Sequence, residues 1–441
     1  MMANVKVVLV SLLVFVAISS CNGGHDQLSP WFYRKSCQQF ENIVRSVTWS
    51  KVAANPNFAA KLLRLHYHDC FVQGCDASIL IDSTDGNTAE KDARPNRSVE
   101  GYEIIDEIKA KLEEECPDTV SCADIVALAA RDAVSYQFGR SMWLVFGGRK
   151  DGRVSLATEA TRDLPSGGAN YTTLRDQFAG LGLNYIDLVA LSGAHTLGVA
   201  HCVVFARRLN FTGKGDIDPS LDPAYAEFLK TQCPSSTPNP ATTVELDESS
   251  SISFDSHYFV GLRHKKGLLG SDAALLTDRR AAWVARSFQN FHVFMAHFGQ
   301  SMKKMGDIGI KTGNDGEIRK NCRVVVAEFK VSMHCNACER IVAKTLLKIK
   351  EVEKFGTDMN NHKVVVMGKI DPEKVLKKLR KKTRKKVEII VDKEEEPNDA
   401  SDEGNLSRPL IVHPLMFDCC KESDGLLMMF SDENPNACSI M

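Results

Sequence analysis

The sequence lacks the features of a membrane-spanning protein over most of its length. Beyond residue 20, no segment reaches the roughly 18 consecutive apolar residues that a transmembrane helix needs. The first three hundred residues also lack long alternating runs of β-branched side chains, so a domain built on β-sheets is not expected there. The 441 residues carry a net charge of −1, and 44% of them are hydrophobic. This composition is ordinary for a soluble globular protein, and the length suffices for two or three domains.

The small net charge hides a strong division along the chain. Residues 1–322 carry 34 Lys and Arg against 36 Asp and Glu, a net of −2. Residues 323–391 carry 18 against 8, a net of +10, whereas residues 392–441 carry 3 against 12, a net of −9. A basic block followed by an acidic tail is typical of domain boundaries. We expect no nucleic-acid partner.

The N-terminal segment has the pattern of a secretory signal peptide. Lys6 precedes an apolar run over residues 7–20 that is too short to span a bilayer, and small residues follow it. We therefore expect residues 1–23 to be a signal peptide. A buried N-terminal helix is the alternative.

The fourteen cysteines fall into groups that follow the same division. Eight lie between residues 37 and 322, an even number in an apparently secreted region, which favours four disulfides without giving their pairing. Cys21 belongs to the expected signal peptide. The remaining five are Cys335, Cys338, Cys419, Cys420 and Cys438.

Apolar residues recur at helical spacing through residues 24–323, so a mainly α domain is expected. Its most informative stretch is LRLHYHDCFVQGCDASIL, residues 63–80. On a helix Arg64 and His68 are four residues apart and emerge on one face. A cation beside an imidazole suits a site where a bound oxygen species loses a proton and then gains negative charge. The plain alternative is a helix end followed by a polar turn.

The same stretch is dense in oxygen-bearing groups. Carboxylate, carbonyl and hydroxyl oxygens come from Asp69, Val72, Gly74, Asp76 and Ser78. Hard oxygen ligands at this density suit Ca²⁺, and the glycine permits a turn.

A second stretch, LVALSGAHTLGVAHC, places His195 at the end of an apolar helical run. A lone histidine in such a place is more often a core residue than a ligand. Composition and spacing leave both readings open.

Four stretches together resemble the secretory class III haem peroxidases of plants: LRLHYHDCFVQGCDASIL, VSCADIVALAARDAV, LSGAHTLG and GEIRKNC. The similarity runs from about Gln27 to Cys322. It implies a mainly α fold that holds haem b, iron protoporphyrin IX, between a distal and a proximal half. It also implies a secreted monomer, in the cell wall or vacuole, that uses hydrogen peroxide to oxidise phenols in one-electron steps.

The resemblance assigns roles to the two histidine stretches. His195 would be the proximal ligand of the haem iron, and Asp272 in LLGSDAAL would hydrogen-bond its other ring nitrogen. His68 would take a proton from hydrogen peroxide and return it to the departing oxygen. Arg64 would stabilise the negative charge that develops there.

Further positions match the family around this site. Asn96 would accept a hydrogen bond from His68 and keep its tautomer correct, with Glu90 linked through a hydrogen-bond network. Pro165 in DLPSG matches the proline at the substrate-access edge. Residues 166–168 (Ser-Gly-Gly) depart from the bulkier residues common there, which puts the donor preference in doubt.

The resemblance also implies two calcium ions and four disulfides. The distal calcium would be held by the five oxygen-bearing residues named above. The proximal calcium would be held by Thr196, Asp247, Ser250, Ser253 and Asp255. The disulfides would be Cys37–Cys116, Cys70–Cys75, Cys122–Cys322 and Cys202–Cys233. Asn170 and Asn210 lie in N-x-[ST] sequences that suit glycosylation on a secreted surface.

From residue 324 the pattern changes to short helices and strands in the order βαββαβ. This order predicts a small ferredoxin-like α+β domain over residues 324–392. Its first loop reads MHCNAC, in which Cys335 and Cys338 could converge on a soft cation such as Cu(I) or Zn²⁺; a redox pair is the alternative. The loop resembles the M-x-C-x-x-C loop of the heavy-metal-associated domain, with Met333 in the first place.

The tail, residues 393–441, is acidic and lacks apolar periodicity, so it is expected to be disordered. It ends in CSIM, which makes Cys438 a candidate for farnesylation, as in heavy-metal-associated isoprenylated plant proteins. The basic run KKLRKKTRKK could add attraction to anionic lipid; a solvated helix face is the plain alternative.

Two functions follow, and they require different compartments. A secreted peroxidase with a metal-binding appendage needs the oxidising route that forms disulfides, whereas prenylation at Cys438 occurs in the cytosol. We favour the enzyme because its motifs cover more of the chain. The alternative is a prenylated, membrane-anchored cytosolic metal-binding protein with a non-functional peroxidase portion. Fusion of two neighbouring genes, or an erroneous gene model, would explain the abrupt join.

Overall fold

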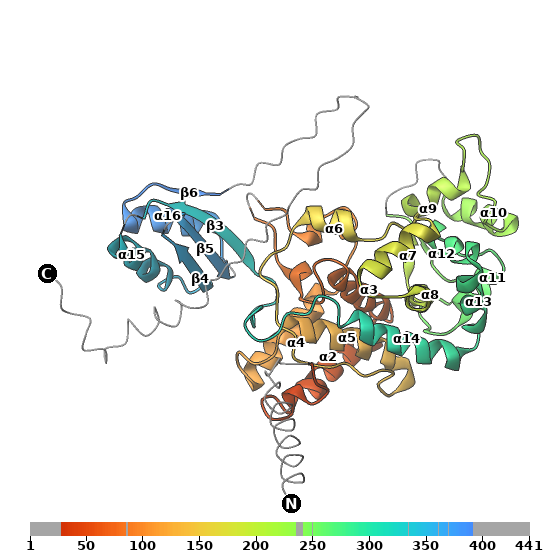
Figure 1. Cartoon of the computed structure of the whole chain (residues 1–441), viewed down its shortest axis with the longest axis horizontal. Helices are drawn as coiled ribbons and strands as arrows, with labels where there is room; N and C mark the ends of the chain where they lie inside the picture. The colour runs from red at the N-terminus through yellow and green to blue at the C-terminus, as the bar shows by residue number, and fades with distance from the viewer. Residues whose placement is uncertain are drawn as a thin grey trace, which may run out of the picture. The chain divides into compact units, whose positions relative to one another are not determined.

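The structure is a computed structural model that describes residues 28–390 except 85–86, 235–240, 249, 334, 360 and 369 (Figure 1). The expected signal peptide and the acidic tail, with Cys419, Cys420 and Cys438, lie outside the described residues. Within the described residues, no helix combines the length and the apolar character that crossing a membrane requires.

Helices dominate the chain up to residue 305. The α-helices are α2 (Phe40–Ala54), α3 (Phe58–Cys70), α4 (Tyr102–Glu115), α5 (Cys122–Ser135), α6 (Ala157–Asp163), α7 (Tyr171–Gly180), α8 (Tyr185–Ser192), α9 (Cys202–Leu209), α10 (Pro223–Gln232), α11 (His257–Arg263), α12 (Gly270–Ala274), α13 (Arg279–Ser287) and α14 (Phe291–Met305). Short 3-10 helices are η1 (Phe32–Arg34), η2 (Ser78–Leu80), η3 (Glu90–Asp92), η4 (Tyr136–Phe138), η5 (Gly193–Thr196) and η6 (Leu275–Thr277). The mainly α expectation is confirmed.

A small antiparallel ribbon, which the sequence pattern did not predict, interrupts this helical region. It pairs β1 (Val199–His201) with β2 (Thr243–Glu245). Each strand is only three residues long, too short for a recognisable alternation of polar and apolar side chains.

The core of the helical region surrounds α5. Every residue of this helix is buried, and it packs against α2, α3 and α4. Its sequence CADIVALAARDAVS is rich in alanine, whose small side chain allows neighbouring helices to approach closely. The helix begins at Ser121, whose hydroxyl accepts the Asp124 backbone N–H at 3.2 Å, as expected of a capping serine.

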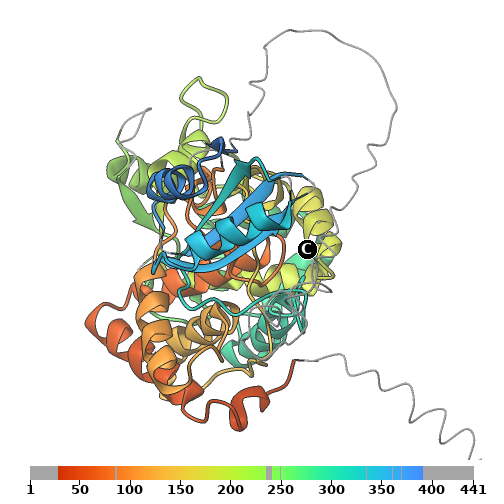
Figure 2. The same cartoon turned by 90° about the vertical axis from the view of Figure 1, so that its left-hand side faces the viewer.

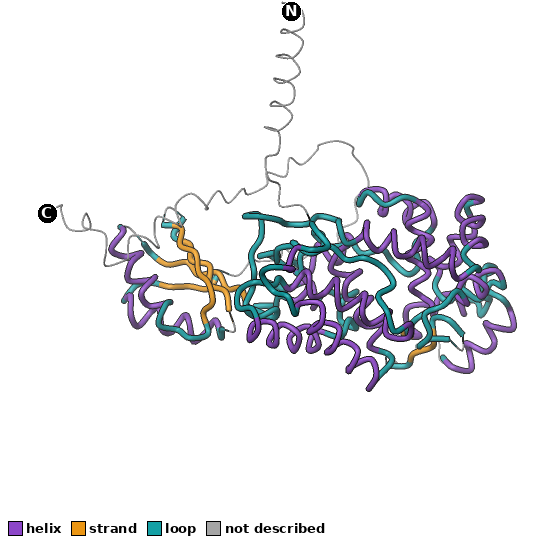
Figure 3. The backbone as a smooth tube through the Cα atoms, turned by 90° about the horizontal axis from the view of Figure 1, so that it is seen from below, coloured by secondary structure: helices purple, strands orange, loops and turns teal. Residues whose placement is uncertain are grey.

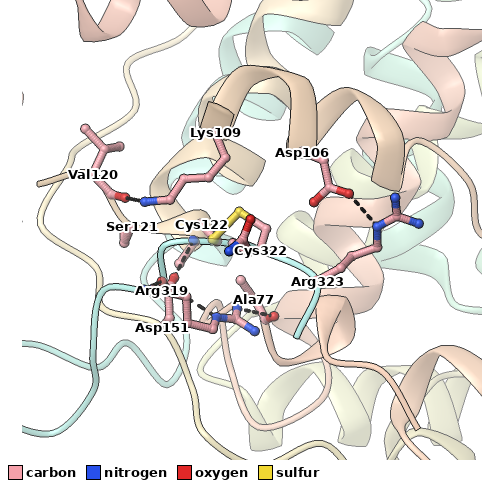
Figure 4. Close-up of a disulfide and its surroundings, with 12 residues drawn as sticks. Ala77, Asp106, Lys109, Val120, Ser121, Cys122, Asp151, Arg319, Cys322 and Arg323 are labelled. Carbon is pink, nitrogen blue, oxygen red and sulfur yellow. Dashed lines mark hydrogen bonds and ion pairs between the residues drawn. A yellow bond between two sulfur atoms is a disulfide. The ribbon is translucent and has the colours of Figure 1, made fainter. Parts of the chain in front are cut away.

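The helical region contains four disulfides, three of which join segments that are 31 to 200 residues apart, while Cys70–Cys75 closes a loop of five. The four are Cys37–Cys116, Cys70–Cys75, Cys122–Cys322 and Cys202–Cys233, the pairs implied by the resemblance. Figure 4 shows Cys122–Cys322, which ties the start of α5 to a residue 200 positions later. Beside it, the buried Arg319 donates to the Ala77 carbonyl at 2.7 Å. The last segment of the helical region is therefore fixed to its core.

A mixed α+β module begins three residues after Cys322. Its elements are β3 (Val325–Val331), α15 (Asn336–Leu346), β4 (Val352–Asp358), β5 (Lys363–Gly368), α16 (Pro372–Thr383) and β6 (Val387–Ile389). The strands form an antiparallel sheet in the order β4-β5-β3-β6 (Figure 3).

The two helices of this module share one hydrophobic core with the sheet. Along β3, the buried Ala327, Phe329 and Val331 alternate with more exposed polar residues, the period of two that a half-buried strand requires. Val342 of α15 and Leu379 of α16 pack into the same cluster, so both helices cover the same face of the sheet (Figure 2). The expected βαββαβ order of elements is therefore present.

Candidate functional site

The first part of the site is built on α3. Arg64 and His68 lie one turn apart, and Arg64 Nε donates to His68 Nε2 at 3.1 Å. His68 Nδ1 and Asn96 Oδ1 are 2.6 Å apart. The Asn96 amide nitrogen donates to the Glu90 carbonyl oxygen at 2.7 Å, which orients Oδ1 toward the imidazole. His68 therefore carries its proton on Nδ1, and Nε2 is the accepting nitrogen.

The electrostatics keep His68 neutral. Burial, followed by the positive charge of Arg64, lowers its pKa from 6.5 to about 3, although the bond to Asn96 opposes this shift. Arg64 itself is held by the Ser98 carbonyl at 2.9 Å and the Pro95 carbonyl at 3.1 Å. These two carbonyls were not identified from the sequence, because backbone acceptors carry no residue-type signal.

The second part of the site centres on His195. The helix that precedes it, α8, ends at Ser192, so His195 lies in the 3-10 turn η5 and not in the helix itself. The turn needs Gly193, because a Cβ there would lie 2.4 Å from the Phe294 ring of α14. His195 Nδ1 lies 2.7 Å from Asp272 Oδ1, although the two residues are 77 positions apart.

Asp272 is buried and accepts three hydrogen bonds. Oδ1 accepts from both His195 and the Tyr258 hydroxyl, the latter at 2.9 Å, and Oδ2 accepts from the Leu269 backbone N–H at 2.9 Å. Burial raises the pKa of Asp272, but the charge and hydrogen bond of His195, with the other two donors, bring it below its usual value. Burial lowers the pKa of His195, but the charge of Asp272 and its hydrogen bond together outweigh burial, so the pKa of His195 is raised.

The two histidines lie on neighbouring segments of the fold. A Cβ at Gly198, three residues after His195, would lie 2.9 Å from the Ala60 Cβ of α3. The positive charge of Arg64 on the same helix opposes protonation of His195. The His195 side chain keeps 32% of its surface exposed. Within the described residues its ring makes hydrogen bonds only through Nδ1, so Nε2 is available as a ligand. A neutral imidazole whose other nitrogen donates to a carboxylate is the donor chemistry that suits haem iron.

Two further predicted residues, Glu90 and Pro165, connect to the surroundings of the two histidines. Glu90 connects to Asn96 through its backbone carbonyl, while its buried carboxyl group has a pKa raised well above the usual range by burial and by the charge of Asp69. Pro165 lies between α6 and α7. Two residues later, the Gly167 carbonyl accepts the Ser271 backbone N–H at 2.9 Å, which brings the predicted access edge next to Asp272.

The predicted distal calcium ligands converge after α3. Within the described residues, three of their buried oxygens make no hydrogen bond: Asp69 Oδ1, Asp76 Oδ2 and Ser78 Oγ. Burial and the adjacent charge of Asp76 raise the pKa of Asp69 well above its usual range. Lys311 Nζ lies 3.1 Å from Asp76 Oδ2, a contact not anticipated from the sequence. Asp69 Oδ1 and Ser78 Oγ are therefore buried without a donor among the described residues, as a cation site requires, whereas Asp76 Oδ2 has the Lys311 ammonium as a partner.

The backbone of this loop depends on Gly74. It has φ of +115°, and a Cβ there would lie 2.6 Å from the Gly309 Cα. Among the amino acids, only glycine can adopt this conformation while the two backbones approach so closely.

The predicted proximal calcium ligands also meet. Thr196 Oγ1 lies 3.1 Å from Asp247 Oδ2, 3.2 Å from Asp255 Oδ1 and 3.4 Å from the Ser253 carbonyl. Ser250 Oγ donates to Asp255 Oδ2 at 2.9 Å. The set therefore forms directly beside His195, the neighbour of Thr196.

One ligand of this set has a further partner. His257 Nδ1 lies 2.7 Å from Asp247 Oδ1, a contact that the sequence did not indicate. Burial raises the pKa of Asp247 to about 6, although His257 and Thr196 oppose the shift.

The predicted metal loop of the C-terminal module brings its two thiols together. Cys335 Sγ and Cys338 Sγ are 3.3 Å apart, and neither forms a disulfide. Cys335 precedes α15 and is exposed, whereas Met333 is fully buried in the module's core. Cys335 is accessible, Cys338 is partly buried against the core, and Met333 has a packing role.

Another group of possible metal ligands is His66, Cys70 and Cys75, all buried. The disulfide between Cys70 and Cys75 uses both sulfurs, so this group is structural.

Comparison with known proteins divides the chain in two. A family model described as Peroxidase matches residues 44–290, and one described as Heavy-metal-associated domain matches residues 328–386. Peroxidase 24 of Arabidopsis thaliana is 62% identical over 300 residues, which cover 67% of this chain and 86% of the relative. Peroxidase 3 of the same plant is 48% identical over 302 residues, 68% of this chain and 92% of the relative. Peroxidase 1 of Oryza sativa subsp. japonica is 45% identical over 331 residues, 74% of this chain and the whole relative.

Proposed function

The chain belongs to the peroxidase family, and on that premise we propose that it is a secreted haem peroxidase that uses hydrogen peroxide to oxidise phenolic donors in one-electron steps. The observation that carries the proposal is the presence of the His68–Asn96 pair beside α3 and of the His195–Asp272 pair on the segment that packs against that helix. Haem b, bound through His195, would supply the redox chemistry.

On the distal side, His68 would transfer a proton of hydrogen peroxide and Arg64 would stabilise the negative charge that develops on the departing oxygen. Neutral His68 accepts a proton from hydrogen peroxide at Nε2, because its Nδ1–H is engaged by Asn96. The same nitrogen then returns the proton to the departing oxygen. Arg64, which stays positive, stabilises negative charge on that oxygen.

On the proximal side, His195 would be held as an electron-rich ligand. Its Nδ1–H donates to the Asp272 carboxylate, which the Tyr258 hydroxyl and the Leu269 backbone N–H hold in place. This arrangement fixes both the tautomer and the orientation of the ring.

We further propose two Ca²⁺ ions at the ligand sets described above, one after α3 and one beside Thr196. The proximal ion would neutralise Asp247 and Asp255. Because Thr196 follows His195 directly, this ion would also hold the proximal turn in place.

The proposed domain plan has four parts. They are a signal peptide (1–23), the peroxidase domain (24–323), a ferredoxin-like heavy-metal-associated domain (324–392) and a disordered acidic tail (393–441). The heavy-metal-associated domain would bind Cu(I) or Zn²⁺ through Cys335 and Cys338. We expect a monomer.

A second candidate function is favoured by the close approach of the Cys335 and Cys338 thiols and by the heavy-metal-associated match. In this alternative, the chain is a cytosolic metal-binding protein prenylated at Cys438, with an inactive peroxidase portion. Lipid analysis of Cys438, together with a thiol assay of the eight disulfide cysteines, separates the two.

The test of the enzyme is haem binding by the full chain from a secretory host. The protein is expected to show a Soret band and to oxidise guaiacol with hydrogen peroxide. His195→Ala is expected to lose the Soret band, because no other predicted ligand replaces Nε2. Tyr33→Phe, which removes a hydroxyl that donates to Asp124 of α5, is the control and keeps the band. A Soret band of full intensity in His195→Ala would refute the ligand assignment.

A further inference from the structure

The third partner of Asp272 points to a role that the proposed function does not include. We infer that Tyr258 is a positioning residue that reduces electron donation from His195 to a bound haem iron. This inference rests on the proposed function, since it requires haem at His195.

The geometry places two donors on one oxygen. Asp272 Oδ1 is 2.7 Å from His195 Nδ1 and 2.9 Å from the Tyr258 hydroxyl. Asp272 and Tyr258 are 1% and 2% exposed, so water does not compete for these bonds. An ionised carboxylate only accepts, and Tyr258 is therefore the donor.

Tyr258 stays protonated in this position. Burial, followed by the negative charge of Asp272, raises its pKa well above the usual value of 10.0. The hydroxyl therefore remains a hydrogen-bond donor at neutral pH.

A shared acceptor weakens each of its bonds. The hydrogen bond from the Tyr258 hydroxyl polarises the negative charge of Asp272 Oδ1 toward the hydroxyl. As a result, Asp272 is a weaker hydrogen-bond acceptor for the His195 Nδ1–H. The imidazole then has less imidazolate character and donates less electron density through Nε2. Asp272 would raise the donor strength of His195, and Tyr258 would limit that increase.

The position of Tyr258 is set by its neighbours. The Tyr258 ring lies edge-to-face with His195, with centroids 6.0 Å apart and planes at 82°. The next residue, Phe259, packs against Phe288 at 5.4 Å and Phe294 at 5.0 Å. The aromatic core thus holds α11, and the hydroxyl has little freedom to leave Asp272.

The test compares two tyrosine hydroxyls that each donate to a buried carboxylate. Tyr258→Phe removes the donor to Asp272 and keeps the ring. Tyr33→Phe is the matched control, because its hydroxyl donates to Asp124 Oδ2 at 2.8 Å, away from both histidines. The readouts are the Fe(III)/Fe(II) midpoint potential and the iron–histidine stretching frequency of the ferrous protein.

Tyr258→Phe is expected to move the potential to more negative values and the stretching frequency upward, whereas Tyr33→Phe leaves both unchanged. Equal potentials and frequencies in wild type and Tyr258→Phe would overturn the inference, as would equal shifts in both variants. Absence of a Soret band in the wild type would instead overturn the proposed function.

A second measurement covers the case in which Tyr258→Phe does not retain haem. Incorporation of 3-fluorotyrosine into the otherwise unchanged protein makes the hydroxyl a stronger donor. The potential is then expected to become more positive, and an unchanged potential would contradict the inference. Labelled Tyr258→Phe, where it holds haem, must show no such change.

Discussion

At the scale of single residues, the site depends on where protons are held. Burial disfavours the charged form of both His68 and the partly exposed His195, yet their pKa values move in opposite directions, because Arg64 acts on His68 and Asp272 on His195. The same residue type can therefore serve as a base on one side of the site and as a ligand on the other.

The lowered pKa of His68 predicts the acid limit of the reaction with peroxide. Its folded-state pKa is about 3, and only the neutral form accepts a proton. The rate of reaction with hydrogen peroxide is expected to be constant from about pH 4 to 7 and to fall about tenfold per unit below about pH 3. Stopped-flow pH jumps measure this decrease in rate before the protein unfolds.

The variant Asn96→Asp tests whether His68 sets this acid limit. A carboxylate on the Nδ1 side favours protonated His68, so the acid limb should move to higher pH. An acid limit that stays at the same pH would contradict the role of His68.

The lowered pKa of His68 also affects stability. Between about pH 3 and 6.5 the unfolded state binds more protons at His68 than the folded state does, so the contribution of His68 to the free energy of unfolding rises with pH across that window.

At the scale of elements, short segments that carry ligands join distant helices. The turn η5 contains both His195 and Thr196, and α11 begins two residues after Asp255. The proximal calcium ligands are therefore connected along the chain to His195 on one side and to Tyr258 on the other.

Calcium removal is expected to destabilise the protein more at high pH. The pKa of Asp247 is about 6 in the metal-free fold, above the ordinary value of 3.8, so protonated Asp247 contributes stability below about pH 4 that is lost as pH rises through about 6. Ca²⁺ at a hundredfold its Kd would restore about 2.7 kcal/mol. Calorimetry with and without chelator at pH 5 and pH 8 measures the difference.

Two variants control this experiment. Asp247→Asn should remove most of the calcium-dependent stabilisation, because the ion loses a charged ligand. Asp176→Asn, at an exposed carboxylate that pairs only with Arg175 among the described residues, should leave it intact. A calcium effect that is the same at both pH values would contradict the assignment to Asp247.

At the scale of the whole molecule, two modules follow each other with almost no linker. The disulfide of Cys322 closes the helical core, and β3 starts at Val325. Arg323, between them, pairs with Asp106 of α4 (Figure 4). Each module nevertheless has its own hydrophobic core.

Separate cores predict separate activities. In the full chain, Cys335→Ala combined with Cys338→Ala should abolish Cu(I) or Zn²⁺ binding, measured by competition with a chromophoric chelator, and leave phenol oxidation within twofold of wild type. His195→Ala is the reciprocal control, which should lose haem and retain the thiol-bound metal. Loss of both activities in either protein would show that the modules depend on each other.

The sequence by itself determined the features that depend only on residues close together in the chain. The i, i+4 spacing of Arg64 and His68, the thiol loop around Cys335, the change of charge at residue 322 and the period of two along β3 all depend on neighbouring residues. Their spacing along a helix or strand is fixed by backbone geometry, so they could be read without a fold. The family resemblance then supplied partners that no local pattern contains.

The tertiary structure brings distant groups together, among them three pairs that the family resemblance had already implied. His195 and Asp272 are 77 positions apart, His68 and Asn96 are 28 apart, and Cys122 and Cys322 are 200 apart. Tyr258 had no signal at all, because a tyrosine in an aromatic helix is ordinarily a core residue. Its hydroxyl became significant when packing of α11 placed it on the oxygen that His195 uses. Such contacts depend on how whole elements pack, and that information is spread over the entire chain.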